Sequence, residues 1–352
     1  MSIAVTIPYY NGAKYIERAL KSVEVQTLRS DEVIVVDDGS SKEQHDFLQS
    51  IKRNFDFDFE IVRKKNGGQG SARNMGVDLS KSDYICFLDQ DDYFLPLHNE
   101  ILMDAVPVSD PRFGWVYADL WEADEEGYVL RTDMIKHHSS HPKTSVIQML
   151  SSDMFILPSA SLVSRKAFLD VGGFDSTFTG YEDDDLFLRI FMHGWSNKFV
   201  DKSVTAWCIN ESSTSYSIKM SYSRMRYIKK LFKLFPSRPG MNRFFFRDLV
   251  VPRFSDIIIS QAISSVLEAK ENMVEYVKLL EEFRGLVAQA GLDQLCHTID
   301  VHLGNLYAHS NLIANSGCRF GGNSYSFPDS EVPYSTKILG GRLVRVIDVA
   351  RL

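Results

Sequence analysis

The sequence has few of the features that mark secreted, membrane-spanning or zinc-binding proteins. It contains only four cysteines, Cys86, Cys208, Cys296 and Cys318. Their spacing matches neither a disulfide framework nor a metal-ligand motif. No apolar run approaches the roughly 20 residues of a membrane-spanning helix, and the N-terminus does not resemble a signal peptide. Because Cys86 lies inside an apolar segment, we expect reduced thiols and a cytoplasmic protein.

The composition is that of an ordinary soluble globular protein, with an uneven distribution of charge. The chain has 352 residues, of which 44% are hydrophobic and 24% are charged, enough for one large domain and a smaller one. The net charge is −7, yet residues 219–253 contain ten Lys or Arg residues and one acid. This segment therefore carries +9 and the remainder −16, which indicates a surface that meets an anionic partner.

Strand and helix patterns alternate over the first ninety residues. Continuous apolar runs, typical of buried strands, lie at 3–7, 33–36, 59–62 and 84–88. We expect Pro8 to end the first strand and Asn11 to cap the helix after it. Ser41 and Gln44 have capping-box spacing for the next helix. The alternation predicts a parallel sheet with right-handed crossovers.

The pattern changes twice along the rest of the chain. Strand-like pieces occur at 115–118, 161–163 and 198–200, and a helix is expected at 183–193. Helical patterns then cover 222–235, 249–267 and 273–290. We therefore predict an α/β domain over 1–218, with a mixed, mainly parallel sheet flanked by helices. A mostly helical extension over 219–352 would follow it, with a loosely packed tail at 320–352.

Polar segments follow the predicted strands, at 8–11, 37–40, 66–70 and 89–92. In parallel sheets, ligands bind outside the carboxyl ends of the strands. The last segment places Asp89, Asp91 and Asp92 at the mouth of a buried strand. Carboxylates crowded in this way are tolerable beside a cation, and hard divalent cations take such oxygen ligands. For Asp92 we favour a different role, as the cap of a following helix.

Six segments occur together in an order that resembles one enzyme family. They are Thr6–Asn11, Val33–Ser40, Asn66–Asn74, Phe87–Asp92, Gly172–Asp175 and Gly180–Asp185. Together they resemble the family 2 glycosyltransferases, which have the GT-A nucleotide-sugar fold with a Rossmann-like sheet. The resemblance covers roughly residues 1 to 215. No GxGxxG follows the first strand, which argues against a nicotinamide enzyme.

The resemblance implies a set of donor-binding and metal-binding residues. The donor would be bound by Pro8, Tyr10, Asn11, Asp38, Asn66, Gly70, Arg73 and Asp89. Asp91 would contact a divalent metal, Mn²⁺ or Mg²⁺, and Asp89 would hold the ribose or a metal-bound water. Many relatives have a histidine further along the chain that completes this site. Asn210 stands at the matching position, so the metal would be held more loosely.

The second acidic cluster is the predicted source of the catalytic base. The resemblance assigns this role to Asp183, which would take the proton of the acceptor hydroxyl, with Glu182 positioning the acceptor or the metal. Since three Asp residues follow one another, Asp184 remains the alternative base. Asp185 is expected to cap or salt-bridge the start of the helix. A single base opposite the leaving group implies inversion at the anomeric carbon.

The expected activity is transfer of a sugar from a nucleotide donor, UDP-linked by preference, to a hydroxyl of a glycan or lipid-linked glycan. Bacterial surface polysaccharide synthesis is the setting by analogy. Two alternatives remain open: a sugar-phosphate nucleotidyltransferase, which would release pyrophosphate, and a nucleotide-sugar-binding module without turnover.

The basic, aromatic-rich segment 219–253 has three interpretations. It could form the packing and solvated faces of the helical extension. It could touch a membrane surface that carries a lipid-linked acceptor, since basic aromatic helices suit anionic interfaces. It could also bind an anionic glycan. We expect no nucleic acid partner, although basic helices of this kind would allow one.

Overall fold

The structure is a computed structural model that describes residues 1–210, 217–315, 334–339 and 342–347. It divides into two compact units, Met1–Ser223 and Arg224–Leu352. The boundary predicted after residue 218 falls inside helix α8 (Ile218–Leu234). The assignment of 1–218 and 219–352 as functional domains stays a prediction.

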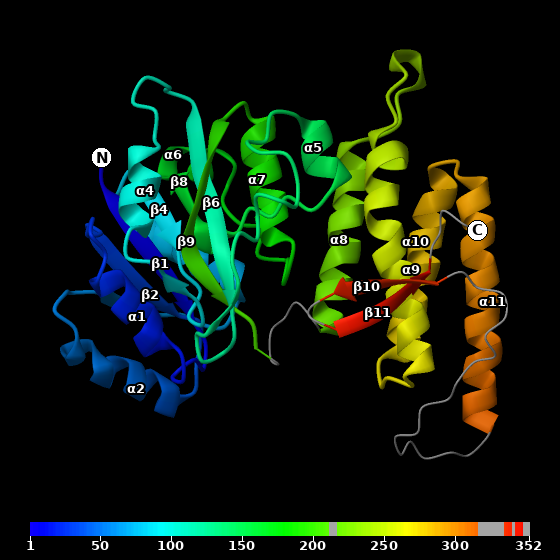
Figure 1. The fold of residues 1–352 in the computed structure, drawn as a ribbon, viewed down its shortest axis with the longest axis horizontal. Coiled ribbons are helices and arrows are strands. Elements are labelled where there is room, and N and C mark those ends of the chain that lie inside the picture. The colour runs from blue at the N-terminus through cyan, green and yellow to red at the C-terminus, as the bar shows by residue number, and fades with distance from the viewer. Residues whose placement is uncertain (211–216, 316–333, 340–341, 348–352) are drawn as a thin grey trace. The chain divides into compact units, whose positions relative to one another are not determined.

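The first unit is built on a nine-stranded sheet, shown in blue to green in Figure 1. Its strands are β1 (Ile3–Tyr9), β2 (Glu32–Asp37), β3 (Glu60–Arg63), β4 (Tyr84–Phe87), β5 (Tyr93–Phe94), β6 (Phe113–Ala123), β7 (Val129–Arg131), β8 (Ser161–Ser164) and β9 (Ser196–Cys208). Their order is β3-β2-β1-β4-β8-β6-β9-β5, with β7 beside β6.

Parallel ladders join β3, β2, β1 and β4, and another joins β6 to β9. The pairs β4–β8, β6–β8, β6–β7 and β5–β9 are antiparallel and shorter. Most paired residues of this sheet therefore lie in parallel ladders, and the predicted mixed, mainly parallel sheet is confirmed.

The helices of the first unit flank the sheet. They are α1 (Ile16–Glu24), α2 (Lys42–Ile51), α3 (Gln69–Leu79), α4 (His98–Asp104), α5 (Val146–Ser151), α6 (Arg165–Asp170) and α7 (Glu182–Met192). Helix α1 buries Ile16, Ala19, Leu20 and Val23, which share one face at helical spacing. The predicted helix at 183–193 is confirmed as α7. The predicted strands also occur, with ends that differ by a few residues or, for β6 and β9, with greater length.

Two predictions for the first strand–helix unit are wrong. Pro8 does not end the strand, because β1 continues through it. The ladder from β1 to β4 stops at Thr6, so a missing N–H at Pro8 leaves no partner on β4 unsatisfied. Asn11 does not cap α1. Its Oδ1 accepts a hydrogen bond from the backbone N–H of Ser41 (2.9 Å) at the start of α2. There the Ser41 hydroxyl accepts from the Gln44 N–H, as predicted.

The second unit is mostly helical, as predicted. Helix α8 enters it and is followed by a 3₁₀ turn (Pro239–Met241), a π-helical turn (Phe246–Val250), α9 (Val251–Leu267), α10 (Met273–Gln289) and α11 (Asp293–Asn315). Strands β10 (Tyr334–Leu339) and β11 (Arg342–Ile347) pair antiparallel. Apart from these two strands, the predicted loose tail at 320–352 lies outside the described residues.

One segment of this unit corrects the expectation about apolar runs. The helical stretch Phe246–Leu267 has 22 residues, and an 18-residue window within it has a mean hydropathy of 1.3, enough by length and composition to cross a membrane. Half of that apolar window is buried inside the protein, however, and residues such as Phe254, Ile258 and Ala262 are in the core. Helix α9 packs against α10 and α11, and buried core helices have the same composition.

The packing of α3 on β1 gives a first prediction. An added Cβ at Gly76 would lie 2.2 Å from Cγ2 of the buried Thr6. We expect Gly76→Ala to lower the free energy of unfolding by about 1–3 kcal/mol, despite the better helix propensity of alanine. Urea denaturation would measure the loss.

The matched control is Gly285→Ala in α10, where an added Cβ meets nothing within 4 Å. This variant should be neutral or more stable by up to about 1 kcal/mol. Equal stabilisation by both substitutions would contradict a close contact between α3 and β1.

Candidate functional site

The predicted site residues gather where β1, β2 and β4 end. These strands are parallel neighbours, so their carboxyl ends lie at one edge of the sheet. The loops that follow them contact one another directly. Asn11, after β1, donates its backbone N–H to the Ser40 hydroxyl (3.0 Å), and its side chain accepts from Ser41, both after β2.

Asp38 fixes the glycine-rich turn. Its carboxylate accepts hydrogen bonds from the backbone N–H groups of Gly67 (2.9 Å) and Gly68 (2.7 Å), and from the Lys64 ammonium (2.6 Å). The side chain is almost completely buried. Gly68 has φ +85°, which favours glycine. Asp38 thus orders the segment that contains Asn66 and Gly70, and this contact was not foreseen.

Gln90 is a residue that the sequence analysis missed. Its side-chain amide accepts from the backbone N–H of Tyr10 (2.9 Å) and donates to the Tyr10 carbonyl (3.3 Å). It also fills the space beside Gly12, where an added Cβ would lie 2.2 Å from its Oε1. The Tyr10 ring is 49% exposed, whereas Pro8 is buried in β1. Gln90 therefore holds the backbone from which the exposed Tyr10 ring projects.

Arg73 links the two acidic clusters. From α3 its guanidinium donates to Asp89 (2.5 Å), after β4, and to Glu182 (3.0 Å), at the start of α7. Arg73 is 2% exposed and lies over the Phe174 ring. Burial alone would lower the pKa of Arg73, but the charges of Asp89 and Glu182 raise it above its usual value. Arg73 is thus an internal cation, and Asp89 and Glu182 border the same region.

Asn74, the residue after Arg73, holds helix α3 to the Gly172–Asp175 turn. The Asn74 side chain donates to the carbonyl of Phe174 and accepts from its N–H, both at 2.8 Å. Gly173 has φ +70°, and an added Cβ there would lie 2.6 Å from the Asn74 Oδ1. The Ala-Arg-Asn and Gly-Gly-Phe-Asp segments therefore form one paired unit that positions Arg73.

Asp91 lies in a strongly acidic environment. Burial, and then the charge of Asp89, raise the pKa of Asp91 to about 6. The Asn210 amide donates to its carboxylate (3.0 Å) and opposes that shift. Asp89, Asp91 and Asn210 thus come together, and carboxylate and amide oxygens suit Mg²⁺ or Mn²⁺. Within the described part of the chain, no three His, Cys, Asp or Glu side chains form a complete ligand set.

Asp92 does not cap a helix, contrary to the prediction. Its carboxylate accepts from the backbone N–H of Cys208 on β9 (2.9 Å) and is almost completely buried. Burial, and then the charges of Asp91 and Asp89, raise the pKa of Asp92 well above its usual range. The side chain ties the segment between β4 and β5 to the end of β9.

The second acidic cluster occupies the first turn of α7. Tyr181, just before it, has φ +62°, an uncommon backbone conformation for a residue other than glycine. Glu182 accepts from Arg73 and Gln69, and Asp185 forms the predicted salt bridge, to Arg189 (2.7 Å). Each of these two carboxylates therefore has a cationic partner.

Asp183 has a different environment. Its carboxylate accepts a hydrogen bond from the backbone N–H of Asp184 (2.9 Å). Burial, and then the charges of Glu182 and Asp184, raise the pKa of Asp183 well above its usual range. A carboxylate with a raised pKa is a stronger base, which suits proton abstraction from a hydroxyl.

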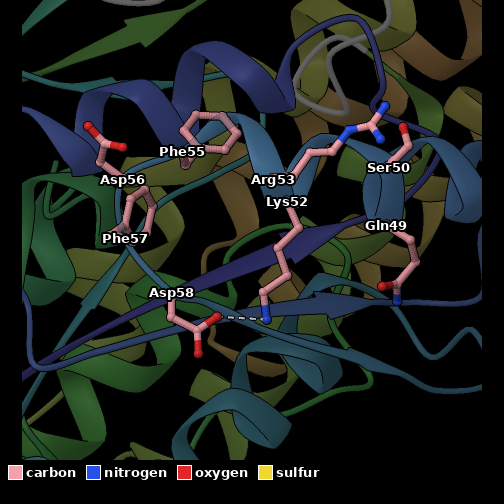
Figure 2. Close-up of a pocket in the computed structure, with 8 residues that line it drawn as sticks. All are labelled: Gln49, Ser50, Lys52, Arg53, Phe55, Asp56, Phe57 and Asp58. Carbon is pink, nitrogen blue, oxygen red and sulfur yellow. Dashed lines mark ion pairs between the residues drawn. The ribbon is translucent and has the colours of Figure 1, made fainter.

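A hollow elsewhere on this unit contains none of the predicted site residues. It measures about 660 Å³ and is lined by residues of the single segment 49–58, including the ion pair between Lys52 and Asp58 (2.8 Å; Figure 2). This segment leads from α2 into the start of β3. The hollow therefore lies at the amino end of a parallel strand, away from the carboxyl ends where the acidic residues gather.

Comparison with known proteins supports the family resemblance. Residues 4–172 match the family model described as "Glycosyl transferase family 2". An uncharacterized glycosyltransferase of Rickettsia conorii is 31% identical over 191 residues, which are 54% of this chain and 31% of that protein. The match thus spans about a third of the length of this relative.

Solved structures share the fold. Residues 1–349 of S. aureus TarS, in complex with UDP-GlcNAc, superpose with a TM-score of 0.61 at 18% identity, covering 99% of this chain and 97% of that one. A mannosyltransferase of Pyrobaculum calidifontis, in complex with GDP-Man and Mn²⁺, gives 0.54 at 15% identity, covering 90% and 87%. At these identities the likeness establishes the fold.

The acidic site gives a prediction about stability. The pKa of Asp91 in the folded protein, about 6, lies above its ordinary value of 3.8. Folding therefore becomes less favourable as the pH rises through the interval between these values. Without metal at pH 7.5, Asp91→Asn should raise the free energy of unfolding by about 1–3 kcal/mol, and the gain should disappear below about pH 4.

Denaturation curves at several pH values in EDTA would measure this difference. Asp78→Asn, at an exposed position of α3, is the control and should change stability by less than about 0.5 kcal/mol at every pH. An Asp91→Asn variant that is less stable than the wild type at pH 7.5 would contradict the strained acid site.

Proposed function

Since residues 4–172 form a domain of glycosyl transferase family 2, we propose that the protein transfers a sugar from a nucleotide donor to an acceptor hydroxyl, with inversion. One observation carries this proposal: Arg73 holds Asp89 and Glu182 on one guanidinium. The acids that follow them, Asp91 and Asp183, are thereby brought to one site. Donor and acceptor chemistry can then share one centre.

The donor is proposed to be UDP-linked and to bind beside β1 and β2. The exposed ring of Tyr10, held through Gln90, offers a stacking surface for the base. Pro8, Asn11, Asn66 and Gly70 would shape the pocket. Asp38 and Arg73 are engaged by internal hydrogen bonds, so we propose that they position the donor loops. The UDP-GlcNAc complex of the structurally similar TarS supports this donor class.

A divalent cation is proposed at Asp91, with Asp89 and Asn210 beside it. The fit rests on the clustered oxygen atoms and on the raised pKa of Asp91, which a cation would relieve. Bound Mn²⁺ or Mg²⁺ would neutralise charge that develops on the departing diphosphate. The Mn²⁺ in the mannosyltransferase structure supports this assignment.

Asp183 is the proposed base. Its carboxylate takes the proton of the acceptor hydroxyl as the oxygen attacks the anomeric carbon. The bond from that carbon to the diphosphate breaks in the same step, which inverts the configuration. Glu182, held by Arg73, positions this turn of α7, and Asp184 is the alternative base.

The acceptor is proposed to be a glycan or lipid-linked glycan, used in the cytoplasm for bacterial surface polysaccharide synthesis. The cysteines among the described residues are free and buried, which fits a reducing compartment. A base at Asp183 favours transfer to a hydroxyl over nucleotidyl transfer. Release of a nucleoside diphosphate, rather than pyrophosphate, would distinguish the two.

Removal of the base should abolish transfer while donor binding persists. Asp183→Asn should lower kcat about 10²- to 10⁴-fold and leave the thermal shift caused by UDP with Mn²⁺ unchanged. Donors would first be identified by a thermal-shift screen of nucleotide sugars, and turnover would be followed by nucleoside diphosphate release. Asp184→Asn is the matched control. If Asp184→Asn is inactive and Asp183→Asn is active, the base is Asp184.

Removal of the metal ligand should act on binding. Asp91→Ala should weaken UDP binding in the presence of Mn²⁺ by about 10- to 100-fold, because the carboxylate that would hold the cation is lost. Isothermal titration calorimetry with Mn²⁺ and with EDTA would measure both affinities. An exposed-site variant, Asp104→Ala, should behave as the wild type. An Asp91→Ala affinity that equals the wild type in Mn²⁺ would exclude this metal site.

A further inference from the structure

A narrow hairpin projects from the second unit between α8 and α9. It is the yellow-green loop that extends past the ends of these helices in Figure 1. Its two arms are held by aromatic pairs, Phe232 with Phe246 (4.8 Å between ring centroids) and Phe235 with Phe245 (6.1 Å). The projection is therefore supported by packed aromatic side chains at its base.

The hairpin holds two arginines opposite each other. Arg238 and Arg243 form an antiparallel bridge with two backbone hydrogen bonds, of 2.8 and 3.2 Å. Side chains of directly opposed residues share one face of such a ribbon, and like charges there repel. Both residues are exposed. An anion bound between them would turn this repulsion into an attraction.

Cations and apolar side chains are combined around this bridge. From Arg226 to Arg247 the sequence has seven Lys or Arg residues and no acid. Some of these cations have partners nearby: Lys229 pairs with Glu282 of α10, and Arg247 pairs with Asp248. At the tip, between the two arginines, Met241 is 59% exposed.

We propose that this hairpin, residues 232–246, docks on an anionic phospholipid membrane. The Arg238–Arg243 pair and the exposed Lys233 would contact phosphate headgroups, and Met241 would enter the interface. Basic segments gain binding free energy with each cation near an anionic bilayer, and an apolar tip adds to it. This proposal rests on the proposed function in one respect: membrane docking would bring the enzyme to a lipid-linked acceptor.

The apolar tip favours a membrane over a soluble anionic glycan. A polyanionic glycan would be bound by the cations alone and would leave Met241 in water, whereas a bilayer accepts both. Insertion of α9 as a spanning helix is disfavoured, because its core residues, such as Phe254 and Val266, would have to leave their packing.

The test is sedimentation of the full chain with lipid vesicles, which needs no enzyme turnover. We expect binding to phosphatidylcholine vesicles that contain 30% phosphatidylglycerol and release by 0.5 M NaCl. Binding to pure phosphatidylcholine should be weaker by at least about thirtyfold, because the contribution of every cation is lost. The double variant Arg238→Gln, Arg243→Gln should bind the anionic vesicles about thirtyfold more weakly, which is the effect of two lost cations. Met241→Ser should weaken this binding about two- to fivefold.

The matched control is Lys202→Gln with Lys278→Gln. It removes two exposed cations outside the hairpin and has the same net charge as the double arginine variant. Its binding to the vesicles should stay within about twofold of that of the wild type. Equal binding of the two double variants would overturn the proposal. So would binding to dextran sulfate without vesicle binding, or membrane association that only detergent reverses. If the wild-type chain turned over a nucleotide sugar but did not bind the anionic vesicles, the docking surface would be refuted and the enzyme assignment would stand.

Discussion

The buried guanidinium of Arg73 is the interaction on which the candidate site depends. It joins three elements that are far apart in the sequence, namely α3, the loop after β4 and the start of α7. Two carboxylates as close as Asp89 and Glu182 would repel each other without it. Removing one partner of a buried ion pair commonly costs about 3–5 kcal/mol, because the remaining charge is left unpaired. The two acidic clusters therefore stay together only while this cation is between them.

The distribution of cations decides which acids remain reactive. Arg73 pairs with both Asp89 and Glu182, and Arg189 pairs with Asp185. Burial and the charges of neighbouring carboxylates raise the pKa values of Asp91, Asp92 and Asp183. Asp92 accepts a hydrogen bond from the backbone N–H of Cys208, which leaves Asp91 and Asp183 for the proposed reaction. A bound cation would stabilise the ionised form of Asp91, and Asp183 could accept a proton from a hydroxyl.

The sequence was sufficient to predict the framework, because the framework depends on local patterns. Apolar runs and helical periodicity indicated the strands and helices, and polar segments after strands indicated the edge where the site lies. The partners of individual side chains were harder to predict. Asp92 bonds to Cys208 and Gln90 bonds to Tyr10 across long stretches of chain. Such pairings depend on strand order, which no local pattern reveals. Asn11 was misassigned for the same reason, since a helix further along the chain supplied its partner.

In the second unit, too, the sequence alone did not decide between two structures. Composition alone cannot distinguish a core helix from a membrane span, because both are uniformly apolar. The packing of α9 against α10 and α11 decides the matter for Phe246–Leu267. Once that helix is placed in the core, the basic excess of 219–253 needs another explanation. Part of it is balanced locally, as at Lys229 and Glu282. At Arg238 and Arg243 the backbone itself sets two cations side by side, and a fold that keeps such a pair exposed at a projecting tip gains stability whenever an anionic surface binds there.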